Sequence, residues 1–69
     1  MKFNYSKLLG RIRECEYTQA ALADAIGISK VTLSAKLNNQ YYFTQGEIIA
    51  ICKVLNIPHK EIPLYFFAV

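Results

Sequence analysis

The sequence has few of the residues from which catalytic and metal sites are built. Its 69 residues include one histidine, two cysteines, three glycines, five acidic residues and no tryptophan. His59 has no carboxylate or thiol partner at a recognisable spacing, and no glycine-rich phosphate loop occurs. We therefore expect a protein that is not an enzyme, with no catalytic residue, bound metal, cofactor or small-molecule substrate.

The two cysteines also limit the class of protein. Cys15 and Cys52 lie far apart, with no CxxC motif and no second histidine, which argues against a zinc site and a disulfide framework. Both fall at apolar helical positions and are expected to be small buried residues in a reducing compartment. No signal peptide is recognisable, and no apolar run reaches the roughly 18 residues of a membrane span. We expect a soluble cytoplasmic protein with no membrane partner.

The chain is rich in apolar residues. Of its residues, 54% are hydrophobic and 13% aromatic, which predicts one folded domain over residues 1–69. The net charge is +3 with a pI near 9.0, a level at which nucleic-acid binding becomes worth testing. Charge alone does not decide the function.

Periodic apolar residues predict three helices in the first half of the chain. The first runs from residue 5 or 6 to residue 15. The second begins after Thr18, a favourable N-cap, and ends at Gly27, whose tolerance of a positive φ suits a C-terminal stop. The third covers residues 30–38 with Ser29 as its N-cap. The link between the last two is so short that we expect them to cross steeply, as in a helix-turn-helix unit over residues 18–38.

The second half of the chain predicts two more helices. Thr44 and Glu47 are spaced as the capping box of a helix over residues 45–55. Pro58 suits the first turn of a short fifth helix that ends before Pro63. The predicted fold class is therefore all-α, a compact five-helix domain with a short apolar C-terminal tail.

The third helix carries the residues that point most clearly to an external partner. Leu33 and Leu37 share the face that must pack inward. Another face consists of short or polar side chains, which a core would not select and which let a helix approach base edges in the major groove of DNA. The residues expected to face bases are Lys30, Val31, Thr32, Ser34 and Ala35.

A second group of residues is expected to hold the DNA backbone. Free N–H groups at the starts of the second and fourth helices favour phosphate oxygens, and polar residues near the end of the third helix flank them. The expected phosphate contacts are Thr18, Gln19, Lys36, Asn38, Tyr41 and Gln45. The same pattern also fits a small bundle without DNA, in which Gln19 is solvated and the tyrosine rings pack on the core.

The pattern Q-x-x-x-A-x-x-x-G-I-S-x-x-x-L-S, from Gln19 to Ser34, resembles the helix-turn-helix of the Cro and phage-repressor (XRE-type) family. The resemblance covers Tyr5 to about Ile62. It implies a lambda-repressor-like five-helix fold that binds double-stranded operator DNA. The contacts it implies are phosphate for Gln19, the DNA backbone for Asn38, and bases for Lys30, Val31 and Ala35.

Three shorter stretches, KLNN, FTQGEI and YFF, look more narrowly like small Cro-like or modulator-of-repression proteins of temperate phages. That resemblance implies a phage or prophage transcriptional regulator of the lysogeny-lysis switch, in the cytoplasm of a bacterial host cell. It leaves two partners open. One is operator DNA, bound through the third helix. The other, as for modulators of repression, is the DNA-binding domain of the phage repressor protein, with the chain acting as anti-repressor or co-repressor.

The third helix departs from the family pattern at positions that affect these expectations. Lys36 replaces a usually apolar residue, and we expect its stem to run along the core with its ammonium in water. Asn39 stands where glycine commonly ends the helix. Asparagine tolerates the left-handed region well enough to preserve that end.

Cations are scarce near the predicted DNA face. Between Thr18 and Glu47 there are only Lys30 and Lys36, so a monomer with about three phosphate contacts would bind weakly at physiological salt. We therefore expect either a homodimer that reads two half-sites about 34 Å apart or a protein partner.

The apolar tail over residues 64–69 has two readings. Its aromatic side chains either fold back to complete the small core, or form a homodimer seam or a docking surface for a repressor. The residues proposed for such a surface are Tyr65, Phe66 and Phe67.

Overall fold

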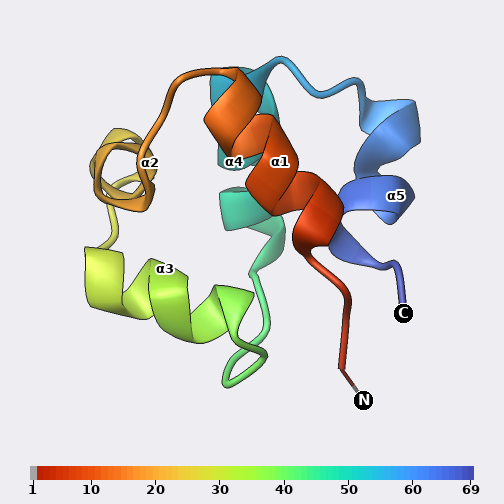
Figure 1. The fold of residues 1–69 in the computed structure, drawn as a ribbon, viewed down its shortest axis with the longest axis horizontal. Helices are drawn as coiled ribbons and strands as arrows, with labels where there is room; N and C mark the ends of the chain where they lie inside the picture. Colours follow the sequence, from red (N-terminus) through yellow and green to blue (C-terminus); the bar gives the residue numbers. More distant parts are fainter. Residues whose placement is uncertain (1) are drawn as a thin grey trace.

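The computed structural model describes residues 2–69, and over this range the chain is all-α, as predicted (Figure 1). Its elements are α1 (Ser6–Glu14), α2 (Gln19–Ile26), α3 (Lys30–Leu37), α4 (Gln45–Leu55), the 3-10 turn η1 (His59–Glu61) and α5 (Ile62–Phe66). Within residues 2–69, no helix has both the length and the apolarity to cross a bilayer.

The predicted caps fix where the helices begin. The hydroxyls of Thr18 and Ser29 each accept a hydrogen bond from the backbone N–H three residues later, at 3.0 and 3.1 Å. At α4, Thr44 accepts from the N–H of Glu47 at 3.1 Å, and the Glu47 carboxylate accepts from the N–H of Thr44 at 2.9 Å. Each of these bonds satisfies an N–H group that has no partner within its helix.

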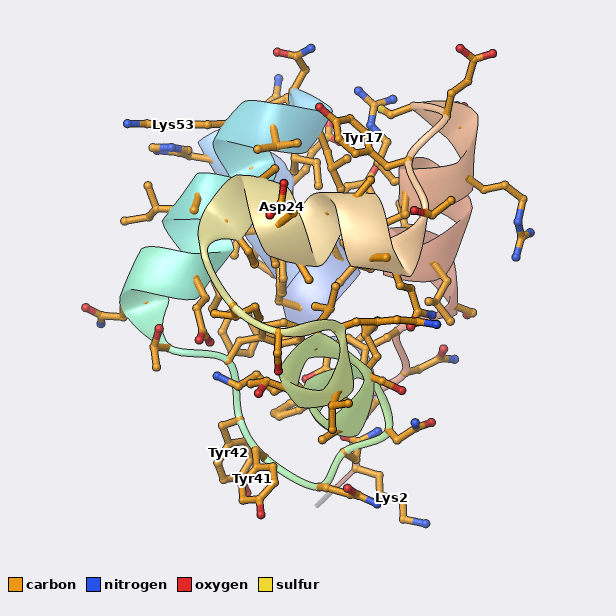
Figure 2. All side chains as sticks on the ribbon, turned by 90° about the vertical axis from the view of Figure 1, so that its left-hand side faces the viewer. Lys2, Tyr17, Asp24, Tyr41, Tyr42 and Lys53 are labelled. Carbon is orange, nitrogen blue, oxygen red and sulfur yellow. The ribbon has the colours of Figure 1, made fainter. Side chains whose placement is uncertain are left out.

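The turn between α2 and α3 sets the direction of α3. Gly27 adopts a φ of +81°, in the left-handed region that glycine enters most readily. Figure 1 views α2 along its axis and α3 from the side, and Figure 2, turned by 90°, shows the reverse. The two helices therefore cross steeply, as predicted. The turn leaves α3 at an edge of the molecule.

All five α-helices contribute to one core. Its largest fully buried side chains are Leu8, Leu22, Leu33, Ile51, Leu55 and Phe66. Cys52 is buried with them, Cys15 is half-buried, and both thiols are free. Burial raises the pKa of the Cys52 thiol, which keeps it protonated and unreactive, as expected for a small apolar core residue.

The C-terminal segment differs from the prediction. The fifth helix does not end before Pro63. Instead, the 3-10 turn follows Pro58, and α5 then runs through Pro63. A proline in the first turn does not stop a helix, because its missing N–H has no intrahelical partner there.

Because α5 continues through Pro63, two residues of the tail belong to the core and not to a partner surface. α5 carries Tyr65 and Phe66 into the core, where both are buried. The prediction that they form an exposed partner surface is therefore wrong, because the core reading applies to them. Phe67, one residue beyond α5, remains half exposed.

Candidate functional site

One face of α3 forms a shallow, open hollow of about 400 Å³. The inward residues Leu33 and Leu37 are buried, whereas Val31 is 79% exposed. The hollow is lined by Lys30, Val31, Ser34, Ala35, Asn38 and Gln40. Four of the five residues predicted to face bases therefore share one accessible surface.

Thr32, the fifth of those residues, does not line the hollow. Its backbone N–H donates to the hydroxyl of Ser29 at 3.1 Å, and that hydroxyl donates to the Thr32 side-chain oxygen at 2.8 Å. Thr32 is therefore part of the N-cap of α3. Helical periodicity places Thr32 next to the accessible face, but it does not show that the cap engages its side chain.

Lys36 does not keep its ammonium in water, so that prediction is wrong. Its side chain is only 10% exposed, and its Nζ lies 2.5 Å from Glu47 Oε1. This ion pair joins α3 to the start of α4. Lys36 therefore fixes the position of α3, and its predicted phosphate contact would require the pair to break.

The environment of Glu47 favours its charged form. Burial by itself raises the pKa of the carboxyl, but hydrogen bonds from Lys36 and Thr44, together with the charge of Lys36, outweigh burial and lower the pKa. The carboxylate thus serves both the capping box of α4 and the contact with α3.

The other predicted phosphate contacts lie in several places. Thr18 and Gln45 are exposed at the starts of α2 and α4, and Gln19 lines a separate hollow beside α1. Asn38 lines the α3 hollow, and Tyr41 is exposed on the loop that follows. Asn38 and Tyr41 are therefore the members of this group placed on or next to the α3 surface.

Gln40 joins the α3 surface although it lies beyond the helix. Asn39 adopts a φ of +64°, as predicted for the helix end. The chain turns back there, and the N–H of Gln40 donates to the carbonyl of Ala35 at 2.9 Å. The signal for including Gln40 was present in the sequence, because a left-handed residue folds the following residue onto the last turn.

Beyond Gln40 the surface becomes aromatic. Tyr41 and Tyr42 are exposed, and Figure 2 shows both at the lower end of the molecule. The ring of Tyr42 lies 6.2 Å from that of Phe3, which lies 5.7 Å from that of Phe67, both measured between centroids. These three rings border an apolar pocket of about 160 Å³ that is also lined by Tyr5, Phe43, Ile48 and Phe66. No pattern in the sequence indicates this pocket, because its residues come from distant segments.

The α3 hollow carries little charge. Lys30 is the one cation among its lining residues, since Lys36 is paired with Glu47. Arg11 donates to the carbonyl oxygens of Leu55 and Asn56 at 2.9 and 3.3 Å, so it caps the end of α4. The hollow is therefore a nearly neutral surface.

Comparisons with known proteins support the narrower of the two resemblances. The family described as "Protein of unknown function (DUF739)" matches residues 1–69. Among solved structures, the solution structure of the modulator of repression (MOR) of the temperate bacteriophage TP901-1 from Lactococcus lactis matches with a TM-score of 0.81. The two chains are 42% identical, and the match covers 97% of this chain and 90% of that one. No curated protein matches. The wider resemblance, to Cro and phage repressors, receives no support from these matches.

Proposed function

The chain belongs to the DUF739 family, and we propose that it is a phage regulatory protein that binds the DNA-binding domain of the phage repressor. One support is the relationship to the phage TP901-1 protein, which is named a modulator of repression. The other support is the chemistry of the α3 hollow. The protein would act by binding alone, without a chemical step.

The observation that carries this proposal is the scarcity of free positive charge on an accessible helix face, where Lys30 is the one cation. Between Thr18 and Glu47, Lys30 is the one cation outside an ion pair. Because each neutralised phosphate contributes about 0.9 to the salt slope, one free lysine provides little electrostatic attraction to DNA. Val31, apolar and highly exposed, suits instead the core of a protein interface, where charged residues are depleted.

The proposed mechanism is competition for the repressor. Repressors of the helix-turn-helix type read their operators through a helix in the major groove. A protein that covers this surface prevents operator binding. The fraction of repressor kept off the operator rises with the concentration of this chain relative to the Kd of its complex with the repressor.

A competition experiment tests the proposal. The repressor of the phage or prophage that encodes this chain is bound to its operator, and the chain is titrated in at about 0.15 M salt, where exposed charges are well screened. We expect the repressor to leave the operator, while the chain alone leaves the operator unbound. An operator shift caused by the chain alone at this salt would contradict the proposal.

A charge substitution tests the assigned face. Val31→Glu places a carboxylate on the most exposed apolar side chain of α3, and it is expected to weaken repressor binding at least about tenfold. Ile49→Glu is the matched control, since Ile49 is an exposed apolar residue on α4. Circular dichroism verifies helicity in both variants. Full affinity in Val31→Glu would exclude α3 as the binding face.

Operator DNA is a second candidate partner, favoured by Lys30, Ser34 and Asn38 in the α3 hollow. Lysine can donate to guanine, and small neighbours let a helix approach the base edges. The low charge would require a homodimer to gain enough phosphate contacts. Gel filtration distinguishes the two candidates. A complex of two chains with DNA favours the operator, and a complex with the repressor alone favours the modulator.

A further inference from the structure

We propose that the partner surface continues from α3 through Tyr41 and Tyr42 to the apolar pocket bordered by Phe3, Tyr42 and Phe67. This pocket takes one aliphatic or aromatic side chain from the surface of the repressor's DNA-binding domain. The inference rests on the proposed function and adds a second half to the interface, for which α3 provides the first.

The α3 hollow is too small to form a stable protein interface by itself. Stable protein interfaces bury roughly 800 Å² per partner and involve about 20–30 residues on each side. Six residues line the hollow, and the eight residues of α3 extend over only about 12 Å. A partner held through α3 must therefore also contact neighbouring surface.

The aromatic pocket lies on the surface that adjoins the hollow. Gln40 lines the hollow and directly precedes Tyr41 and Tyr42. The ring of Tyr42 contacts that of Phe3, which contacts that of Phe67. The surface is therefore continuous from α3 to the pocket. In Figure 2, Tyr41 and Tyr42 lie below α3, whereas α2 lies above it.

The pocket has the size and chemistry for an apolar side chain. Its volume is about 160 Å³, and a cavity of roughly 150 Å³ accommodates benzene. All of its lining residues are aromatic or aliphatic. Tyr5 and Phe66 are buried, whereas Tyr42 and Phe67 are exposed. A side chain that fills it would therefore remove water from two exposed rings. Buried aromatic contacts of this kind commonly dominate binding energy.

The charges around this surface favour a different protein over a second copy of the chain. In a symmetric dimer the same patch meets itself. Lys30 and Lys2 would then face a second copy of this surface, and neither the hollow nor the pocket has an acidic lining residue to pair with them. Figure 2 places Lys2 at the same lower end of the molecule as Tyr41 and Tyr42. A different protein can supply carboxylates to both lysines from residues beside its DNA-reading surface, which is itself basic, and the repressor domain is the partner already proposed.

A matched pair of substitutions tests this inference by calorimetric titration against the repressor's DNA-binding domain. Phe67→Ala removes a ring from the pocket, and Leu64→Ala removes an apolar side chain of the same segment that does not line it. The two residues are equally exposed, at 50% and 51%. We expect Phe67→Ala and Tyr42→Ala to weaken binding about tenfold, and Leu64→Ala less than about twofold.

A titration of the unmodified protein avoids any effect of substitution on folding. Ring and amide NMR signals of Phe3, Tyr42 and Phe67 are expected to shift when the repressor domain is added. The signals of Leu64 and Ile49, which lie outside the surface, are expected to stay in place.

The outcomes separate this inference from the proposed function. If Val31→Glu abolishes binding while Phe67→Ala and Tyr42→Ala bind normally and the ring signals do not move, the extended surface is wrong and the function stands. If the unmodified chain does not bind the repressor domain, both are wrong. A concentration-dependent homodimer that Phe67→Ala abolishes would assign the pocket to a second copy and overturn the inference.

Discussion

The side chain of Asn39 holds the backbone of Phe3 through two reciprocal hydrogen bonds. Oδ1 accepts from the N–H of Phe3 at 2.8 Å, and Nδ2 donates to its carbonyl at 2.9 Å. The N–H of Asn4 donates in turn to the carbonyl of Ala68 at 2.7 Å. The N-terminal segment is therefore bonded both to the end of α3 and to the C-terminal tail. The segment that precedes α1 and the tail that follows α5 lie at the same side of the molecule in Figure 1.

Asn39→Gly should release this segment while preserving the end of α3, because glycine tolerates the φ of +64°. Each lost hydrogen bond is worth about 0.5–1.5 kcal/mol. We therefore expect the free energy of unfolding to fall by about 1–3 kcal/mol and amide exchange at Phe3 to accelerate. Denaturant unfolding and hydrogen exchange followed by NMR measure the two effects.

Asn56→Gly is the matched control for that variant. Asn56 also has a left-handed φ, +54° at the end of α4, and its side chain makes no hydrogen bond among the described residues. In both variants the new glycine adds the same conformational entropy to the unfolded chain and destabilises the fold by the same amount for that reason. Equal destabilisation of both variants, with unchanged exchange at Phe3, would show that the bonds to Phe3 contribute nothing.

The Lys36–Glu47 pair is expected to couple α3 to α4 energetically. Removing one partner leaves the other charge largely buried and unpaired. In a cycle of Lys36→Met, Glu47→Gln and the double variant, we expect an interaction energy of about 0.5–3 kcal/mol. Denaturant unfolding at neutral pH measures it. Single effects that simply add in the double variant would mean that the pair does not hold the helices together.

The same pair predicts a pH dependence of stability. The folded protein lowers the pKa of Glu47 below its ordinary value of 4.5. A lowered pKa stabilises the folded state above the unfolded-state pKa, and this stabilisation is lost as the pH falls through the folded-state value. The difference in unfolding free energy between the unmodified protein and Glu47→Gln should therefore be constant near neutral pH and shrink below about pH 4.5. A difference that grows on acidification would reverse the assigned sign.

Local signals in the sequence were sufficient to predict most of the fold. The caps at Thr18, Ser29 and Thr44, and the left-handed residues Gly27 and Asn39, each depend on chemistry within a few residues. Such interactions set helix boundaries before any tertiary contact is known. The prediction at Pro63 is wrong because a proline is compatible with the first turn of a helix as well as with its end.

The candidate surface was only partly predictable, because much of it depends on contacts between distant segments. Periodicity correctly placed Val31 on the accessible face of α3. It gave no indication that Lys36 pairs with Glu47, eleven residues away, or that Phe3 meets Phe67 across the whole length of the chain. The first contact reduces the charge available for DNA, and the second builds the apolar pocket.

Substitution by alanine is expected to have opposite effects on the free energy of unfolding at Gly10 and Gly27. A Cβ at either position would meet nothing within 4 Å, so the backbone alone decides the outcome. Gly10 lies within α1, where alanine is favoured, and Gly10→Ala should raise the free energy of unfolding by about 0.5–1 kcal/mol. Gly27 has a φ of +81°, and Gly27→Ala should lower it by about 1–2 kcal/mol. Urea midpoints at unchanged m-value measure both effects. If Gly27→Ala proved as stable as the unmodified protein, the left-handed turn that directs α3 outward would be incorrect.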